Sequence, residues 1–245
     1  MITIRTVRLA FLTCAAAGAG YASQLITNGG FETGTLSGWT VTTETGSYLG
    51  TGFYADNSTL TPESGSTTVG PKTGSDYAVS DTEGGPGTAV LSQSFTVPGG
   101  ISSVVLSYSM FVNSYGGDVT DSAGDLNYSG AASQYGLVSL LAAGTSLFST
   151  TTGDLMNFYE GTNSGANPNA YINYSYNITS LVSAGQTYTL RFAEVNNLNV
   201  LNMGVDNVSV VTTTATSVIP EPGSIFLVVP GIFGIWFLRR LSRPV

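Results

Sequence analysis

The chain has 245 residues, a single cysteine and no histidine. Without histidine it lacks the commonest general acid–base side chain and the usual zinc and copper ligand. Between Gln24 and Ile219, 14 acidic residues stand against 2 basic ones, and this net charge of −12 repels phosphates, so nucleic acid is not an expected partner.

Residues 1–22 have the pattern of a secretory signal peptide. Arg5 and Arg8 precede the apolar run 9–20, which is too short to span a bilayer and ends in a small-x-small site. Cleavage after Ala22 fits this site, and cleavage after Ala19 is the alternative. A buried N-terminal helix would explain the same run, but nothing amphipathic follows it. The segment therefore predicts export.

The cysteine lies inside this segment. Cys14 would leave with the signal peptide, so the mature protein is expected to contain no disulfide and no thiol chemistry. An exported domain of this kind must be stabilised by burial of its core or by a bound metal ion.

Residues 24–211 alternate apolar and polar side chains in short segments that Gly, Asn, Asp and Pro separate. This period of two predicts half-buried strands, and spaced strands without a long amphipathic helix predict an all-β sandwich. The stretches 115–135 and 150–169 are rich in Gly, Asp, Asn and Ser and predict long loops. The expected apolar rows are Ala89, Leu91, Phe95 and Val97; Val104, Leu106, Tyr108, Met110 and Val112; Ile172, Tyr174, Tyr176 and Ile178; and Tyr188, Leu190 and Phe192.

Several short motifs in this region resemble those of galactose-binding-like jelly rolls, a group that includes several carbohydrate-binding modules. They are Leu25 to Gly34 followed by Gly38-Trp39, Asp76 to Ala78 with Leu91 to Phe95, and Tyr188 to Phe192 with Gly204 to Val210. The resemblance implies an antiparallel jelly-roll β-sandwich. It also implies a sugar ligand as the class to consider first.

A structural calcium ion is the cofactor that this resemblance implies. The matching positions are Glu32 near the first strand and Asp206 near the last, with Asp76 from the middle of the domain. Carboxylates with nearby carbonyls suit this hard cation. The alternative is that Glu32 and Asp206 accept hydrogen bonds from turn amides.

Aromatic side chains are the candidates for stacking on a sugar ring, because a tyrosine offers both an apolar face and a hydroxyl. Trp39 is the obvious one, but its position favours the core. The exposed candidates border the long loops or the polar side of a strand: Tyr115, Tyr128, Tyr135, Tyr159 and Tyr171.

Acidic residues offer two further hypotheses. Asp118, Asp121 and Asp125 lie in one loop, where a second calcium site or a catalytic pair is the functional hypothesis, although solvated carboxylates are the simpler interpretation. A glycosidase needs two carboxylates about 5 Å or about 6.5–9.5 Å apart. No spacing in the sequence selects a pair among the candidates Glu83, Asp118, Glu160 and Glu194.

The C-terminus carries three signals in order after a Thr-rich spacer at 212–219. They are Pro220-Glu221-Pro222, an apolar stretch with a transmembrane helix expected at 224–238, and the cluster Arg239-Arg240. The whole apolar stretch, 223–238, has 16 residues, which give a helix of about 24 Å, and the arginines beyond it would stay on the cytoplasmic side. A plain membrane anchor is the alternative to a processed signal.

This ordered trio resembles the PEP-CTERM sorting signal, whose domain is also named after the C-terminus of an ice-binding protein. The resemblance implies anchoring in the inner membrane, recognition by an exosortase after export, and transfer to the cell surface or extracellular matrix. The expected function is a non-catalytic module with extracellular polysaccharide as its partner. The alternatives are a structural surface protein or adhesin with a protein partner, and a glycosidase.

Overall fold

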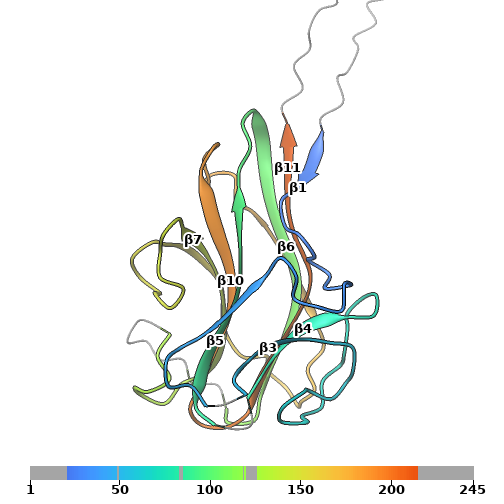
Figure 1. The fold of residues 1–245 in the computed structure, drawn as a ribbon, viewed down its shortest axis with the longest axis vertical. Helices are drawn as coiled ribbons and strands as arrows, with labels where there is room; N and C mark the ends of the chain where they lie inside the picture. The colour runs from blue at the N-terminus through green and yellow to red at the C-terminus, as the bar shows by residue number, and fades with distance from the viewer. Residues whose placement is uncertain (1–20, 49, 83–84, 118, 120–125, 215–245) are drawn as a thin grey trace, which may run out of the picture. The chain divides into compact units, whose positions relative to one another are not determined.

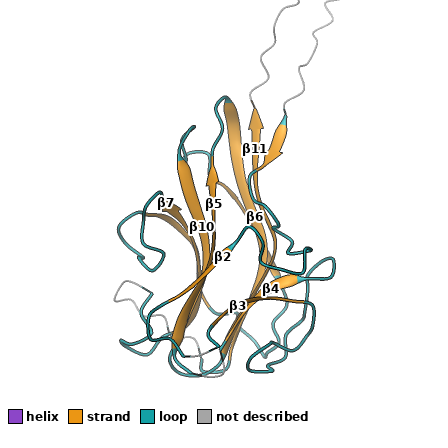
Figure 2. Cartoon of the chain, viewed as in Figure 1, coloured by secondary structure: helices purple, strands orange, loops and turns teal. Residues whose placement is uncertain are grey.

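The computed structural model describes residues 21–48, 50–82, 85–117, 119 and 126–214, and these form a β-sandwich (Figure 1). Figure 2 shows the described segments as strands and loops. Within these segments there is no helix of the length and hydrophobicity that crossing a membrane requires. Residues 1–20 of the expected signal peptide and the whole expected sorting signal, with Pro220, Glu221, Pro222, Arg239 and Arg240, lie outside the described residues.

Two antiparallel sheets make up the sandwich. The first sheet has the order β3-β4-β11-β6-β9, and β1 pairs with β11; the second has the order β2-β5-β10-β7-β8. The strands of the first sheet are β1 (Ala22–Gln24), β3 (Gly52–Asp56), β4 (Tyr77–Asp81), β6 (Ile101–Ser114), β9 (Ile172–Asn177) and β11 (Leu201–Thr214). Those of the second are β2 (Thr40–Thr43), β5 (Gly87–Thr96), β7 (Gln134–Ala142), β8 (Asp154–Gly161) and β10 (Thr187–Asn196).

The chain passes repeatedly from one sheet to the other. After β4 in the first sheet it enters β5 in the second, returns to β6, and crosses again to β7; later it runs from β8 to β9, β10 and β11 in alternate sheets. This connectivity is that of a jelly-roll sandwich. It brings the first and last strands side by side, as Figure 1 shows for β1 and β11.

The core lies between the sheets and follows the predicted alternation. The expected rows of β5, β6 and β10 are all buried there, among them Leu106, Met110, Leu190 and Phe192. Burying one such side chain contributes about 1.5–3 kcal/mol to stability. The β9 row was predicted correctly only in part, because Ile172, at the start of this edge strand, is exposed.

Trp39 belongs to the core, as its position in the sequence favoured. Its ring centroid lies 5.5 Å from that of Phe31 and 6.0 Å from that of Phe192. Its Nε1 donates a hydrogen bond to the carbonyl of Asn28 at 3.1 Å. The ring joins the N-terminal loop to β10 and is not available to a ligand.

The last strand is longer than the sequence suggested. β11 continues through Thr212 and Thr213 to Thr214, which the sequence had placed in a spacer that begins at residue 212. Ala22 pairs with Thr213, and the other edge of β11 pairs with β6 over the same residues. Pairing on both sides satisfies the backbone of these threonines, so they extend the sheet.

Candidate functional site

The outer face of the second sheet is covered by the protein's own loops. Leu126 and Tyr128, from the β6–β7 loop, and Leu147 and Phe148, from the β7–β8 loop, pack on it. The two loops are joined by a hydrogen bond of 2.8 Å from the Leu126 amide to the Phe148 carbonyl. The side chains beneath them are Val90, Tyr135, Leu137, Ala193 and Val195. A sugar therefore finds no open platform on this part of the sheet.

Arg191 fixes the β7–β8 loop to this face. Its guanidinium donates to Ser139 Oγ at 2.8 Å and to the Leu147 carbonyl at 2.7 Å, and it pairs with Asp154 Oδ2 at 3.0 Å. Burial raises the pKa of Asp154, and the charge of Arg191 opposes that rise. The sequence placed Arg191 on the polar side of its strand, but the side chain is fully buried because the loops close over it.

The covering loops also overturn one predicted ligand residue. Tyr135 was expected to be exposed, yet 2% of its surface is accessible, because it lies under the β6–β7 loop. Tyr128 is half-buried in the same cluster, and its hydroxyl donates to the Thr45 carbonyl at 3.2 Å. Both rings fill space within the domain.

Tyr171 is likewise held by the protein. It is half-buried, packs edge-on against Phe111 with ring centroids 4.9 Å apart, and its hydroxyl donates to the Gly70 carbonyl at 2.9 Å. The ammonium group of Lys72 lies 6.0 Å from the ring centroid. Burial raises the pKa of the Tyr171 hydroxyl, and the charge of Asp206 adds to that rise.

Tyr159 belongs to an aromatic cluster at the side of the sandwich where β8 and β9 are the edge strands. Its ring packs edge-on against Tyr174, with centroids 5.8 Å apart, and Tyr174 stacks on Tyr108 at 4.9 Å. Tyr176 extends the cluster to Phe158 at 4.8 Å. Sequence reasoning placed Tyr174 and Tyr176 in the core; they are half-buried because β9 has a neighbour on one side only.

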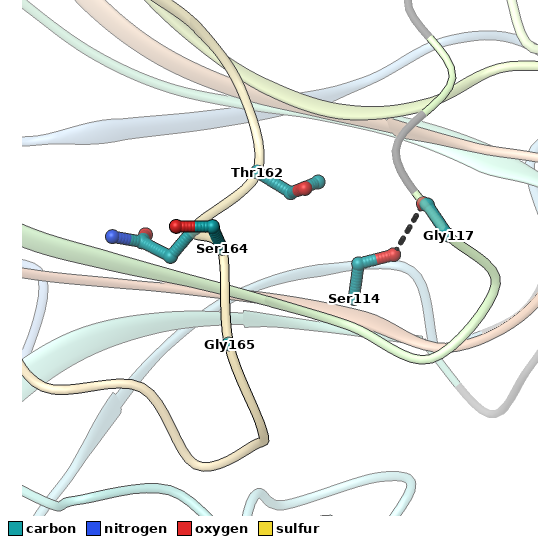
Figure 3. A pocket seen from close by; sticks show the side chains of 6 residues that line it. Ser114, Gly117, Thr162, Ser164 and Gly165 are labelled. Carbon is teal, nitrogen blue, oxygen red and sulfur yellow. Dashed lines mark hydrogen bonds between the residues drawn. The ribbon is translucent and has the colours of Figure 1, made fainter.

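A polar pocket lies where the loops after β6 and β8 meet, and its volume is about 280 Å³. Figure 3 shows its lining, with Thr162 reaching from one loop toward the other. The described residues of the lining contribute hydroxyl, amide and backbone groups and no charged side chain: Ser114, Gly117, Thr162, Asn163, Ser164 and Gly165. These groups donate and accept hydrogen bonds without a net charge.

Backbone-directed hydrogen bonds shape the pocket. Ser114 Oγ donates to the Gly117 carbonyl at 2.6 Å, as drawn in Figure 3. Asn163 Oδ1 accepts from the Val112 amide at 2.6 Å, which ties the second loop to the end of β6. Tyr115 directly follows Ser114 and is 41% exposed. It is the predicted ligand residue that the structure leaves most open.

The predicted calcium ligands meet near the N-terminal loop. The Cβ position of Gly30 is 3.7 Å from Glu32 Cγ and 3.9 Å from Asp206 Oδ1. Glu32 accepts hydrogen bonds from the amides of Ser75 and Asp76, at 3.0 to 3.3 Å. Burial raises the pKa of Asp206, whereas hydrogen bonds from backbone amides lower it and the charge of Glu32 raises it.

These contacts match the alternative expectation of carboxylates that hold turn amides. Asp206 Oδ2 accepts from the amides of Lys72 and Thr73 at 2.9 and 3.0 Å. In the described part of the chain, no group of three or more Asp, Glu, His or Cys side chains is placed to hold a metal ion. A calcium ion here would have to share carboxylates that the backbone already uses, so the ion stays a prediction.

The acids considered for a glycosidase separate in the structure. Glu160 pairs with Leu137, whose side chain lies on the outer face of the second sheet, whereas Glu194 points between the sheets to Ser80. The two carboxylates therefore lie on opposite faces and cannot flank one bond. Glu83, Asp118, Asp121 and Asp125 fall outside the described residues.

The fold and this loop pocket define an antiparallel β-sandwich of the jelly-roll class. Neither a protein-family model nor a curated protein matches the sequence. Several of the solved structures that resemble the chain are carbohydrate-binding modules. One is TmCBM61 in complex with β-1,4-galactotriose, with 14% identity and a TM-score of 0.45 over 79% of this chain and 99% of that one.

Two other similar structures belong to different kinds of protein. The Stig cyclase Fisc from Fischerella sp. TAU has 15% identity and a TM-score of 0.45, over 80% of this chain and 100% of that chain. The K1 cleaved adhesin domain of Lys-gingipain from Porphyromonas gingivalis W83 has 17% identity and a TM-score of 0.42, over 82% and 100%. These likenesses concern the fold, so function has to be argued from the residues.

Proposed function

We propose that the chain is an exported, non-catalytic surface or matrix module that binds an uncharged polysaccharide at the pocket between the loops after β6 and β8. The exposed Tyr115, which follows the lining residue Ser114 in the chain, would be a second contact. The observation that carries this proposal is that the described part of the pocket lining consists of hydroxyl, amide and backbone groups. Sugar hydroxyls pair with such groups, and an exposed tyrosine ring gives them an apolar face to stack on.

The test is retention of the protein on polysaccharides, measured by pull-down and by affinity electrophoresis. The panel includes the host's own exopolysaccharide and neutral glycans. Tyr115→Ala removes the exposed ring, and Thr162→Val removes one pocket hydroxyl at nearly constant volume; both should weaken retention about tenfold. Tyr48→Ala is the matched control, because Tyr48 is exposed in the β2–β3 loop. Absence of retention on every glycan would remove the proposal and favour the structural or adhesin alternative.

The ends of the chain carry the proposal of export. The basic and apolar segments at both termini, with Pro220-Glu221-Pro222, support processing by an exosortase and delivery to the surface. Replacing these three residues by alanine in the native host should abolish processing. An unchanged mature mass and location would contradict this part of the proposal.

The position of signal cleavage is part of the same proposal. β1 begins at Ala22, which pairs with Thr213, so cleavage after Ala19 would keep the whole strand, whereas cleavage after Ala22 would remove its first residue. We therefore favour cleavage after Ala19. N-terminal sequencing of the mature protein distinguishes the two positions.

A further inference from the structure

The core is polar at the end of the sandwich where β10 finishes. Along β10 the inward row changes from Leu190 and Phe192 to Glu194 and Asn196, and both polar side chains are at most 1% exposed. Three buried hydroxyl side chains join them from other segments: Thr51, Ser80 and Thr82. Buried polar groups are costly unless they find partners, so this cluster needs an explanation.

Hydrogen bonds place these side chains around one another. Ser80 Oγ donates to Glu194 Oε2 at 2.5 Å, and Asn196 Nδ2 donates to Thr82 Oγ1 at 3.0 Å. These contacts bring β4 against the end of β10. The other side-chain oxygens, Glu194 Oε1 and Asn196 Oδ1, accept no hydrogen bond in these contacts.

Thr51 can approach the end of β10 because Gly87, on the neighbouring strand β5, has no side chain. Gly87 pairs with Asn196 in the second sheet, and the Cβ position of Gly87 is 2.6 Å from Thr51 Oγ1. Paired residues of antiparallel strands have Cβ atoms about 4.5–5.5 Å apart. The hydroxyl of Thr51 therefore lies beside the residue that pairs with Asn196, on the face of the sheet that Asn196 shares.

Three oxygens of this cluster are buried without a hydrogen-bond partner in the described part of the protein: Glu194 Oε1, Asn196 Oδ1 and Thr51 Oγ1. Leaving such an acceptor unpaired costs about 1–3 kcal/mol, and more for a charged group. Every one of the three is an oxygen atom. This common chemistry suits a cation as the missing partner.

The local charge is negative. The sequence between residues 21 and 214 has two bases, and both are used elsewhere: Arg191 pairs with Asp154 on the outer face, and Lys72 lies over Tyr171. Asp81, next to Ser80, adds a second carboxylate. Burial raises the pKa of Glu194 well above its usual value, Ser80 opposes the rise, and Asp81 reinforces it.

We propose that Glu194, Asn196 and Thr51 bind a calcium ion between the two sheets, at a site distinct from Glu32 and Asp206. Calcium takes six to eight oxygen ligands from carboxylates, amides, hydroxyls and water. The ion would satisfy the three unpaired oxygens and hold β10 to the segment before β3. When it binds, Glu194 releases its proton to solvent and coordinates as the carboxylate. The two negative charges of Glu194 and Asp81 balance the charge of the ion.

The experiment is thermal unfolding of the purified full-length chain in EGTA, CaCl2, MgCl2 or NaCl. At a hundredfold excess over its dissociation constant, calcium should raise the melting temperature by about 5–10 °C, and magnesium or sodium should not. Glu194→Gln should abolish the shift. Because Gln replaces a neutral carboxyl group by a neutral group of similar shape, this variant should fold and melt in EGTA at or above the wild-type temperature.

Two further variants identify the site. Glu160→Gln is the matched control, since Glu160 is exposed on β8, and it should keep the full shift. Thr51→Val should weaken calcium binding about tenfold, measured by calorimetry. If the calcium-induced rise in melting temperature survives in Glu194→Gln and is lost in Glu32→Gln, the ion binds at Glu32 and Asp206, and the inference is overturned. A wild-type melting temperature that is indifferent to calcium overturns it as well.

Discussion

Arg191 on β10 reaches across β7 to form an ion pair of 3.0 Å with Asp154 on β8. On the way its Nε donates to Ser139 Oγ of β7, so one side chain ties three strands of the second sheet together. The same guanidinium fixes the carbonyl of Leu147, which keeps the β7–β8 loop over the sheet. This pair is therefore the main polar support of the closed outer face.

Removing one partner of this pair should be strongly destabilising. Asp154→Ala leaves Arg191 buried without a counter-charge, and we expect the free energy of unfolding to fall by about 3–5 kcal/mol. Urea unfolding measures the loss. The double variant Asp154→Leu with Arg191→Met, which removes both charges, should recover most of it. A loss below about 1 kcal/mol for Asp154→Ala would show that the pair behaves as an exposed one.

Gly29 should tolerate no side chain. Its Cβ position is 1.9 Å from the Val208 carbonyl oxygen, and the Val208 amide donates to the Gly29 carbonyl at 2.8 Å. Gly29→Ala must push the N-terminal loop away from β11, which we expect to cost about 1–3 kcal/mol in urea unfolding. Gly99→Ala is the control, because no atom lies within 4 Å of its Cβ position. Equal stability of the two variants would contradict the close approach.

Glu194 should make stability depend on pH. Its pKa in the folded state is raised well above the ordinary value of 4.5, so the folded state holds a proton that the unfolded state has lost. The contribution is fully present below the unfolded pKa and is lost as the pH rises through the folded pKa, by about 1.4 kcal/mol per pH unit.

The measurement is urea unfolding in EGTA between pH 4 and pH 9, expressed as wild type minus Glu194→Gln. This difference cancels the other titrating groups, and we expect it to fall steadily from about pH 4.5 upward. Added calcium should flatten the decline, because the ion stabilises the carboxylate. Parallel stability curves for the two proteins would show that Glu194 titrates alike in both states.

Asp206→Asn tests the corner near the N-terminal loop. Asp206 Oδ2 accepts from two backbone amides, and an asparagine NH2 in that place would face them with donors. We expect a loss of about 1–3 kcal/mol in EGTA, where no calcium is bound. Glu160→Gln is the control, because Glu160 is exposed on β8 and is not among the predicted calcium ligands. If calcium also binds here, the wild type but not Asp206→Asn should gain stability at this site.

The inward rows of β5, β6 and β10 could be predicted from the sequence because alternation is a local property. The sequence was wrong about β8 (Asp154–Gly161), which lies in the stretch 150–169 that was predicted to be a loop. Leu106, Met110, Leu190 and Phe192 face the core as expected, and the Gly-Trp motif indicated that Trp39 does too. The extension of β11 through Thr212 to Thr214 could not be predicted. It depends on pairing with residues 22–24, which are far away in the sequence.

The candidate site was harder to predict. The sequence identified the loop that carries Tyr115, and the structure adds Thr162 and Ser164 from the loop after β8. Tyr135 was wrongly expected at the surface, because the covering loop was not foreseen. The signal available in the sequence was Arg191, between Leu190 and Phe192. A single arginine with uncharged neighbours on both sides indicates that loops could cover the outer face of the sheet there.

The sequence by itself determined that this chain is an all-β domain, and which side of most core strands is apolar, because a period of two is written in neighbouring residues. The tertiary structure alone decided that Arg191 is buried and that Glu194 meets Ser80, 114 positions earlier in the chain. The physical reason is that the burial of a side chain, and with it the cost of carrying a charge, depends on which distant segments of the chain pack over it. The path of the loops determines which segments these are.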